Sequence, residues 1–482
     1  MMNPFFWARM RRLAAGTLLL VGAVAFQAEP TLTPPPVTRP NVLILLADDM
    51  TFNAIRAAGN PDILTPTLDS LMGVGTTFTR ACIMGGPVPA ICSPSRAMLL
   101  TGRPLYRLEP PYPNNPGQFP LEGRYELLPE TFRKAGYTTF TTGKHHNGKK
   151  ELSLGYTQAK SVYFGGMGQH VGLPLFDHNP TGHYPADQAR PMARHSSEEF
   201  AGATIDFIRQ VPHEQPFLAY VPFTAPHDPR QPPAAYRARY DAARLNLPKN
   251  LMPDHPFDNG ELHIRDEELL PHPRDPRRIR EELTDYYALI THLDAQIGRI
   301  LAALRATGRA ENTLVVFAAD NGLALGQHGL LGKQNLYEHS IRVPMIWAGP
   351  GVPKGQKRAA LAYLHDVYPT LCELVGIQPP ASVQSKSLVP ALRSAWAVIH
   401  PTLYFSYRNV QRALRDERYK LIEYVVKGRR TTQLFDEQTD PLELTNLASD
   451  PRQADRVKAM RAELLKTRLA EGDTTATFWN QF

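Results

Sequence analysis

The chain has 482 residues, of which 43% are hydrophobic, so a folded protein with a large core is expected and general disorder is excluded. The formal net charge is +7 and the sequence pI is near 9.2, but the basic residues are scattered along the chain. Because no block of Lys and Arg is present, we expect no nucleic-acid partner, whereas a mild positive bias suits an anionic substrate. The three cysteines, Cys82, Cys92 and Cys372, do not form a disulfide framework.

The first 40 residues have the pattern of an export signal followed by a linker. Arginines precede an apolar run from Leu13 to Phe26, and Ala23-Val24-Ala25 provides a cleavage site. The apolar run is shorter than a membrane-spanning helix needs, and an uncleaved membrane anchor is the alternative. We therefore expect a signal peptide over residues 1–28, a proline-rich linker over residues 29–40, and an exported protein that is periplasmic or secreted.

Three continuous apolar runs predict strands that are buried on both faces, as in a parallel sheet. These runs cover residues 41–46, 217–223 and 313–319. Helical periodicity between them predicts helices, among them residues 196–211 and 280–307. The fold class is therefore α/β, with a large, mostly parallel sheet sandwiched by helices over residues 41–376.

The residue pattern of the sequence changes after about residue 376. Alternating residues predict short antiparallel strands, and a helical segment follows them. The strands are expected over residues 402–407, 411–415 and 419–426, and the helix over residues 451–469. Residues 377–482 are thus predicted to form a C-terminal α+β subdomain with a small antiparallel sheet.

Oxygen-bearing side chains follow two of the buried strands. Asp48 and Asp49 come after the first strand, and Asp320 and Asn321 come after the third. Open α/β sheets bind ligands at the carboxyl ends of their strands, and adjacent carboxylates repel one another unless a cation lies between them. Solvated loop acids are the alternative. An all-oxygen donor set suits Ca²⁺ or Mg²⁺ and does not suit zinc.

Basic side chains occupy the same kind of position after two other strands. Lys144 and His146 follow a strand predicted at residues 138–142, and alternate residues of an extended segment point the same way. His227 follows the strand at residues 217–223. Taken singly, these residues also fit surface or structural roles. Together they place fixed positive charge and titratable groups beside the predicted metal site.

Two long irregular segments lie between the predicted elements. Residues 163–194 contain His170, His178 and His183, and they fit either a substrate-facing loop or an ordinary surface loop. Residues 230–280 are rich in proline and charge and predict a long surface excursion that forms a wall of the pocket.

The stretch Cys92-Ser93-Pro94-Ser95-Arg96 predicts the start of a helix that ends at Gly102. Ser93 is expected to be the N-cap, and Pro94 suits the first turn. Cys92 then lies beside the positive end of the helix, with Arg96 one turn further on. Both features favour an anionic cysteine or an anionic group attached to it. A buried structural cysteine at a capped helix is the alternative.

Cys92-x-Pro94-Ser95-Arg96, followed by Thr101-Gly102-Arg103, resembles the signature of the formylglycine-dependent type I sulfatases of the alkaline-phosphatase-like superfamily. The resemblance runs from about Arg39 to Leu447. Further matching elements follow in the order of the family: Gly143-Lys144-x-His146-x-Gly148, Ala225-Pro226-His227-x-Pro229, and the run from Asp320-Asn321-Gly322 through Lys333 to Arg342-Val343-Pro344. His145 departs from the usual aromatic residue of the family, so the pocket wall is expected to differ there.

The resemblance implies that residues 41–376 are the catalytic domain of a sulfatase. Cys92 would mature to formylglycine, whose hydrate attacks sulfur and forms a covalent sulfate intermediate. One divalent cation, Ca²⁺ or alternatively Mg²⁺, would be held by Asp48, Asp49, the modified Cys92, Asp320 and Asn321. Arg96 would stabilise the hydrate, Lys144 and Lys333 would bind the sulfate, His227 would bind substrate and protonate the leaving oxygen, and His146 would restore the aldehyde.

The resemblance also implies partners. A formylglycine-generating enzyme or an anaerobic maturation enzyme would modify Cys92, and the substrate would be a sulfated glycan or its oligosaccharide fragments. Choline sulfate and aryl sulfates are alternative substrates. The sequence predicts no oligomeric state.

Two other functions compete with the sulfatase assignment. The first is a phosphatase or phosphonate monoesterase of the same superfamily, but two-zinc members need extra histidine ligands, and Asn321 argues against them. The second is a non-catalytic glycan-binding relative. Loss of Cys92 or of the acidic residues would have supported that reading, and all of them are present.

Overall fold

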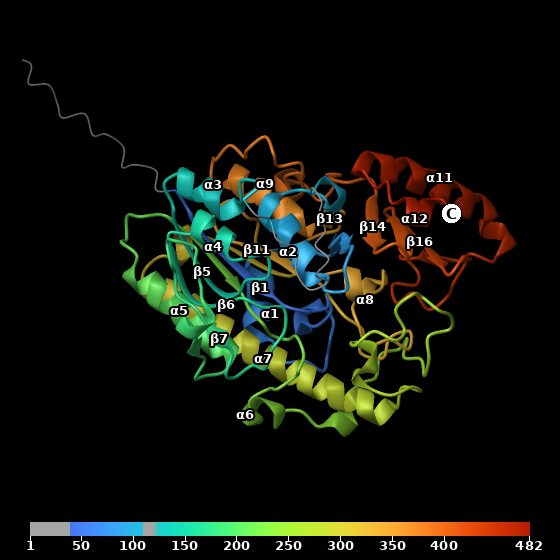
Figure 1. Ribbon diagram of the computed structural model, residues 1–482, viewed down its shortest axis with the longest axis horizontal. Helices are drawn as coiled ribbons and strands as arrows, with labels where there is room; N and C mark the ends of the chain where they lie inside the picture. The colour runs from blue at the N-terminus through green and yellow to red at the C-terminus, as the bar shows by residue number, and fades with distance from the viewer. Residues whose placement is uncertain (1–38, 109–120, 122) are drawn as a thin grey trace, which may run out of the picture. The chain divides into compact units, whose positions relative to one another are not determined.

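An eight-stranded mixed sheet forms the centre of the protein (Figure 1). The computed structural model describes residues 39–108, 121 and 123–482. Residues 39–482 form a single compact unit that contains both the main sheet and the C-terminal sheet. The predicted signal peptide and all but two residues of the predicted linker lie outside the described residues. Within the described part of the chain, no helix has both the length and the apolar character needed to cross a membrane.

The central strands of this sheet are parallel, as predicted, and one end of the sheet is mixed. β1, β9, β5 and β6 run parallel to β10, whereas β11 is antiparallel to its neighbours β10 and β2. The strand order is β12-β2-β11-β10-β1-β9-β5-β6. The strands are β1 (Asn41–Ala47), β2 (Thr76–Phe78), β5 (Thr138–Lys144), β6 (Gln158–Tyr163), β9 (Phe217–Pro222), β10 (Thr313–Ala319), β11 (Met345–Ala348) and β12 (Gln356–Arg358).

The register of the two innermost strands positions the acidic residues. Every residue of β1 is buried, and β1 pairs with β10 from Asn41 opposite Thr313 to Ala47 opposite Ala319. The two strands therefore end at the same level of the sheet, so the residues that follow them emerge side by side.

Helices cover both faces of the sheet. In Figure 1, α5 and α7 lie on one side, and α2, α3 and α9 lie on the other. Their bounds are α2 (Cys92–Thr101), α3 (Leu128–Lys134), α5 (Ser196–Gln210), α7 (Pro276–Ala306) and α9 (Val367–Leu374). The long helix α7 begins four residues before its predicted start. Asp275 is its N-cap and accepts a hydrogen bond from the Arg277 N–H, and Pro276 occupies the first turn.

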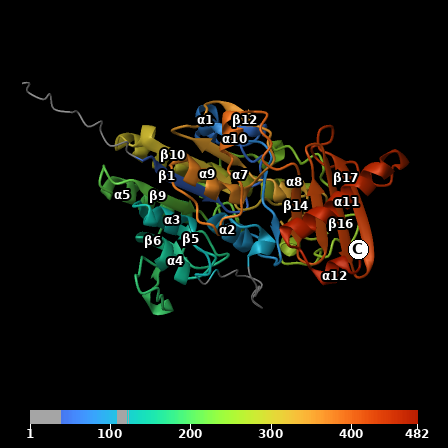
Figure 2. The same cartoon turned by 90° about the horizontal axis from the view of Figure 1, so that it is seen from above.

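The C-terminal residues form a separate five-stranded sheet that lies beside α11 at one end of the molecule (Figure 2). β14, β15, β16 and β17 are antiparallel, and β4 pairs in parallel with β14. The elements are β4 (Gly85–Gly86), β14 (Leu403–Tyr407), β15 (Gln411–Arg415), β16 (Tyr419–Val426), β17 (Arg429–Asp436) and α11 (Ala454–Glu471).

The short strand β4 ties this sheet to the segment that precedes Cys92. Gly85 has a φ of 96°, and a Cβ at this position would lie 2.1 Å from the Ser406 carbonyl oxygen. Only glycine permits both the backbone conformation and the close approach. The segment before the cysteine motif is therefore fixed by the C-terminal sheet.

A buried cluster of charges also joins the two sheets. Glu338 of α8 (Glu338–Ile341) lies 2.6 Å from the Arg415 Nη1 and 3.0 Å from the Lys420 Nζ. Burial alone would raise the pKa of Glu338, but Arg415 and Lys420 hold it well below its usual range. Since loss of one partner would leave a buried charge uncompensated, this cluster fixes the C-terminal sheet against the segment that follows β10.

Candidate active site

Cys92 is the first residue of α2 and its side chain is buried. Gly102 ends the helix in the left-handed conformation with a φ of 62°, as predicted. The prediction of Ser93 as N-cap is wrong: Ile91 precedes the helix, and no side chain caps it. The Ser93 hydroxyl instead donates to the His146 carbonyl at 3.2 Å, which joins the helix to the segment after β5.

Two basic side chains from the end of β5 contact the Cys92 sulfur. The His146 Nδ1 lies 3.3 Å from Sγ, and the Lys144 Nζ lies 3.6 Å from it. Burial raises the pKa of the Cys92 thiol, although Lys144 and Lys333 act in the opposite direction. A free thiol at this position is therefore held neutral by its surroundings.

Arg96 bridges the ends of the two central strands. Its Nε donates to the Asp320 Oδ2 at 2.8 Å, its Nη2 lies 3.6 Å from the Asp48 Oδ1, and its Nη1 donates to the Lys144 carbonyl at 3.0 Å. The Lys144 Nζ in turn lies 2.6 Å from the Asp48 Oδ2. All four side chains are buried, so these ion pairs are shielded from solvent.

Asp49 is held by groups from the segment after β10. The Lys333 Nζ donates to both carboxylate oxygens at 2.7 and 2.9 Å, and the Asn321 Nδ2 donates to Oδ1 at 2.6 Å. Asp49 has a φ of 66°, an unusual conformation for a residue other than glycine. Burial opposes ionisation, but His227 and Lys333 hold the pKa of Asp49 well below its usual range.

These residues fit a hard divalent cation. Ligand atoms of Asp48, Cys92 and Asp320 all lie within 4.8 Å of one another. Within the described chain, the buried Oδ1 atoms of Asp48 and Asn321 accept no hydrogen bond. Burial and the neighbouring Asp48 carboxylate raise the pKa of Asp320 to about 6. Unsatisfied oxygens beside crowded carboxylates form the donor set that Ca²⁺ and Mg²⁺ prefer.

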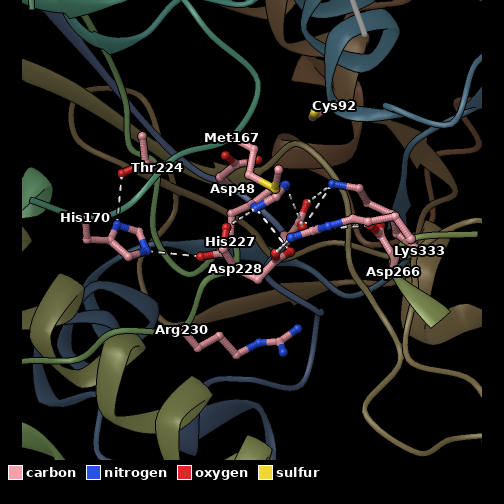
Figure 3. A network of polar contacts seen from close by, with 12 residues as sticks. Asp48, Cys92, Met167, His170, Thr224, His227, Asp228, Arg230, Asp266 and Lys333 are labelled. Carbon is pink, nitrogen blue, oxygen red and sulfur yellow. Dashed lines mark hydrogen bonds and ion pairs between the residues drawn. The ribbon is translucent and has the colours of Figure 1, made fainter. Parts of the chain in front are cut away.

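His227 lies beside the acidic cluster on the segment after β9 (Figure 3). Its Nδ1 is 2.7 Å from the Asp228 carbonyl oxygen, which can only accept, so Nδ1 carries a proton. Its Nε2 lies 3.5 Å from the Asp49 Oδ2. This tautomer leaves Nε2 as the atom that faces the site.

His170 contacts the backbone of His227, and this contact was not predicted from the sequence. Its Nε2 donates to the His227 carbonyl at 3.0 Å (Figure 3), and its Nδ1 lies 2.9 Å from the Ser196 hydroxyl. Burial lowers the pKa of His170 to about 4, so the ring is neutral at pH 7. Of the other two histidines in this segment, His178 is half-buried and His183 is exposed. Only the fold distinguishes the three.

All ten predicted site residues therefore lie around one centre at the carboxyl edge of the sheet. The sulfatase family model matches residues 40–377. The chain belongs to the sulfatase family. A second model, described as the C-terminal region of N-sulphoglucosamine sulphohydrolase, matches residues 326–470 of this sulfatase. Family membership makes the protein a sulfuric ester hydrolase.

Relatives and solved structures extend over almost the whole sulfatase. An ulvan-active sulfatase of Formosa agariphila is 29% identical over 459 residues, which cover 90% of this chain and 82% of the relative. A solved structure in complex with its substrate D-glucosamine-2-N,6-O-disulfate has a TM-score of 0.76 at 21% identity and covers 90% of this chain and 99% of its own. The phosphonate monoester hydrolase of Agrobacterium radiobacter has a TM-score of 0.71 at 22% identity, with coverages of 90% and 96%. At these identities the two solved structures show the fold alone.

Proposed function

We propose that this sulfatase is exported to the periplasm or secreted, and that it hydrolyses a sulfate ester on a sulfated glycan or its oligosaccharide fragments. The observation that carries the proposal is the position of the Cys92 sulfur, 3.3 Å from His146 and within 4.8 Å of carboxylate oxygens of Asp48 and Asp320. The ulvan-active relative and the fold neighbour bound to a sulfated glucosamine support a glycan substrate. The signal-like sequence at residues 1–28 supports export.

Cys92 is the residue that a maturation enzyme would convert to formylglycine, and the hydrate would supply one hydroxyl as nucleophile and a second hydroxyl for release of the sulfate. Asp48, Asp49, Asp320 and Asn321, with an oxygen of the modified residue, would hold one Ca²⁺, with Mg²⁺ as the alternative. When bound, the cation supplies positive charge that polarises a sulfate oxygen and lowers the pKa of a hydroxyl.

The remaining site residues have complementary roles in this proposal. Lys144 and Lys333 bind the sulfate and neutralise charge that develops on its oxygens. Arg96 holds Asp48 and Asp320 in place beside residue 92. His227 protonates the oxygen of the departing alcohol from Nε2, a step that requires a second proton on the ring because the Nδ1 proton is committed to the Asp228 carbonyl. Burial lowers the pKa of His227, and the Asp49 carboxylate, 3.5 Å from Nε2, favours the doubly protonated form.

His146 is proposed to remove the proton whose loss releases the sulfate from the enzyme. Its Nδ1 is the nitrogen that lies 3.3 Å from the Cys92 Sγ, the atom that the modification replaces with oxygen. The two histidines thus act at opposite ends of the reaction: His227 faces the leaving alcohol and His146 faces residue 92.

The competing function is hydrolysis of phosphate or phosphonate monoesters, because the phosphonate monoester hydrolase of Agrobacterium radiobacter shares the fold. The donor set argues for the sulfatase, since the oxygens of Asp48, Asp49, Asp320 and Asn321 suit one hard cation better than two zinc ions. The test compares kcat/KM for 4-nitrophenyl sulfate, 4-nitrophenyl phosphate and a phenylphosphonate monoester. We expect the sulfate to be the best substrate, and a clear preference for either phosphorus ester would reject the proposal.

A further inference from the structure

Arg265 and Asp266 form a polar rim with the Asp228 carboxylate beside His227, and neither Arg265 nor Asp266 has a role in the proposed reaction. The Arg265 Nη2 donates to the Asp228 Oδ2, and the Arg265 Nη1 donates to the Asp266 Oδ1 at 3.1 Å. The other oxygen of Asp228 lies 3.3 Å from the His227 Nδ1. Figure 3 shows Asp228 and Asp266 in the same network of contacts as His227 and Lys333. Arg265 is therefore joined to His227 through Asp228, on the Nδ1 side of the ring. Its neighbour Asp266 accepts a hydrogen bond from Gln334, the residue after Lys333, at 2.7 Å, so Arg265 lies at the rim of the site between the segments that carry His227 and Lys333.

The segment that carries Arg265 is firmly anchored. Two residues further along, the buried Glu267 accepts hydrogen bonds from the backbone N–H groups of Leu331 and Gly332, both at 2.8 Å. These residues directly precede Lys333. Arg265 is thus fixed relative to the sulfate-binding lysine, and a ligand meets a guanidinium that is already oriented.

Arg265 is the accessible member of the rim. Its side chain is 45% exposed, whereas the side chains of Asp228 and Asp266 are only 8% and 17% exposed. A guanidinium offers donors and no acceptor, so it binds oxygen acceptors of a substrate. Because two carboxylates already offset its charge, a neutral oxygen suits this position better than a second anion does.

An exposed apolar side chain also lies among the site residues. Met167 is 48% exposed, and its neighbour Gly166 packs on the His146 ring, where an added Cβ would lie 2.6 Å from Nε2. Figure 3 shows the Met167 thioether among the site residues. A sugar ring has both an apolar face and a hydroxyl-bearing edge, so it can use both kinds of wall.

We propose that Arg265 is a specificity-determining residue that donates a hydrogen bond to a ring hydroxyl of the leaving sugar, while Met167 contacts the apolar face of that sugar. This assignment rests on the proposed glycan substrate and makes it more specific. The preferred leaving group carries a free hydroxyl, and not a second sulfate, at the position that faces Arg265.

The test is a cycle that combines enzyme variants with substrate variants. The substrates are the monosaccharide sulfate that the enzyme hydrolyses best and deoxy analogues that each lack one ring hydroxyl, with 4-nitrophenyl sulfate as a reference. In the unaltered enzyme, one deoxy analogue should lose about 10–100-fold in kcat/KM, the effect of a hydrogen bond to a charged donor. In Arg265→Ala, that deoxy analogue and its parent sugar sulfate should have about equal kcat/KM values.

Arg237→Ala is the matched control. The Arg237 side chain is 43% exposed and pairs with two carboxylates, Glu281 at 2.7 Å and Asp285 at 2.6 Å, as Arg265 pairs with two. Arg237 belongs to α6 (Ala234–Arg237), outside the site, so this variant should keep the ratio between the sugar and its deoxy analogue.

Three outcomes would overturn the assignment in different ways. If Arg265→Ala lowers kcat/KM by the same factor for the sugar sulfate and for every deoxy analogue, Arg265 acts only through Asp228 on His227 and does not contact the substrate. If the enzyme prefers a disulfated sugar and Arg265→Ala abolishes that preference, the acceptor is an anion. If the enzyme hydrolyses 4-nitrophenyl sulfate but no sulfated sugar, the proposal of a glycan substrate is wrong, and the proposed role of Arg265 is rejected together with it.

Discussion

The Nδ1 of His146 lies 3.3 Å from the Sγ of Cys92, although the two residues come from different elements. Two further contacts fix this relationship: the Ser93 hydroxyl donates to the His146 carbonyl at 3.2 Å, and the Asn147 Nδ2 donates to the Ser93 carbonyl at 2.8 Å. The segment after β5 and the start of α2 are thus joined by two hydrogen bonds that both involve Ser93, the residue next to Cys92. This places the imidazole where it can act on whatever atom replaces the sulfur.

His146→Ala should therefore fail after the first half of the reaction. We expect a burst of about one equivalent of alcohol, followed by turnover reduced about 10²–10⁴-fold, the usual effect of losing a general base. Sulfated enzyme should accumulate and be detectable by intact mass. His178→Ala, in a half-buried position outside the described site contacts, is the control. Slow turnover without a burst or a sulfated species would show that His146 acts before sulfate transfer.

His227→Ala should depend strongly on the leaving group, since only a poor leaving group needs its proton. We expect a loss of about 10²–10⁴-fold on an alkyl sulfate and a much smaller loss on 4-nitrophenyl sulfate. The measurement is kcat/KM across a series of sulfates whose alcohols differ in pKa. An equal loss on every member of the series would contradict the assignment of His227 as the acid.

His170→Ala should give a weaker form of the same defect, because His170 positions the His227 backbone through the 3.0 Å bond to its carbonyl. Loss of that hydrogen bond should lower kcat for alkyl sulfates about 10-fold with little change in KM, and His170→Gln, which retains a donor, should recover part of the loss. A rise in KM alone, with the same effect on aryl and alkyl sulfates, would assign His170 to substrate binding instead.

The metal site should hold one hard cation per chain, because its ligands are oxygens. Metal analysis of the purified protein should find Ca²⁺ or Mg²⁺, and chelation should abolish activity reversibly. Asp320→Asn should lose most of the metal and at least about 10²-fold of the activity, while the exposed Asp177→Asn should lose neither. Two tightly bound zinc ions per chain would contradict this account.

The charge cluster between the sheets predicts a large effect on stability. Lys420→Met would leave Glu338 and Glu443 in the interior without their lysine partner, so the free energy of unfolding should fall by about 3–5 kcal/mol. Lys427→Met is the matched control: Lys427 is 85% exposed and pairs with Asp258 at the surface, so its loss should cost less than about 1 kcal/mol. Thermal and denaturant unfolding measure the loss of unfolding free energy in each variant. Equal losses in Lys420→Met and Lys427→Met would reject the stabilising role of the cluster.

The central strands could be predicted from sequence because they are continuous apolar runs. The prediction for residues 313–319 coincides with β10, and that for residues 41–46 is one residue shorter than β1. Site residues at strand ends could be predicted for the same reason, since parallel strands deliver them to one edge. These signals are local, so they need no knowledge of the tertiary structure.

Features that depend on distant contacts could not be predicted. β4 is two glycines whose pairing with β14 has no periodic pattern. The Ser93 hydroxyl bonds a carbonyl more than fifty residues away, although its local sequence favours an N-cap. His170 and Arg265 acquire their roles from backbone and carboxylate partners in other segments, so a single lone histidine or arginine carries no such signal.

The chemical state of Cys92 is the most direct test of the central claim. Mass spectrometry of the peptide that contains residue 92 should be combined with a multiple-turnover sulfatase assay on the same preparations. We predict that activity rises in proportion to the fraction of Cys92 present as formylglycine, and that Cys92→Ser folds and binds the metal but completes at most one turnover. Pro94→Ala and Arg96→Ala should lower the converted fraction even when the protein folds. Full multiple-turnover activity from protein in which Cys92 is entirely an unmodified thiol would contradict the account.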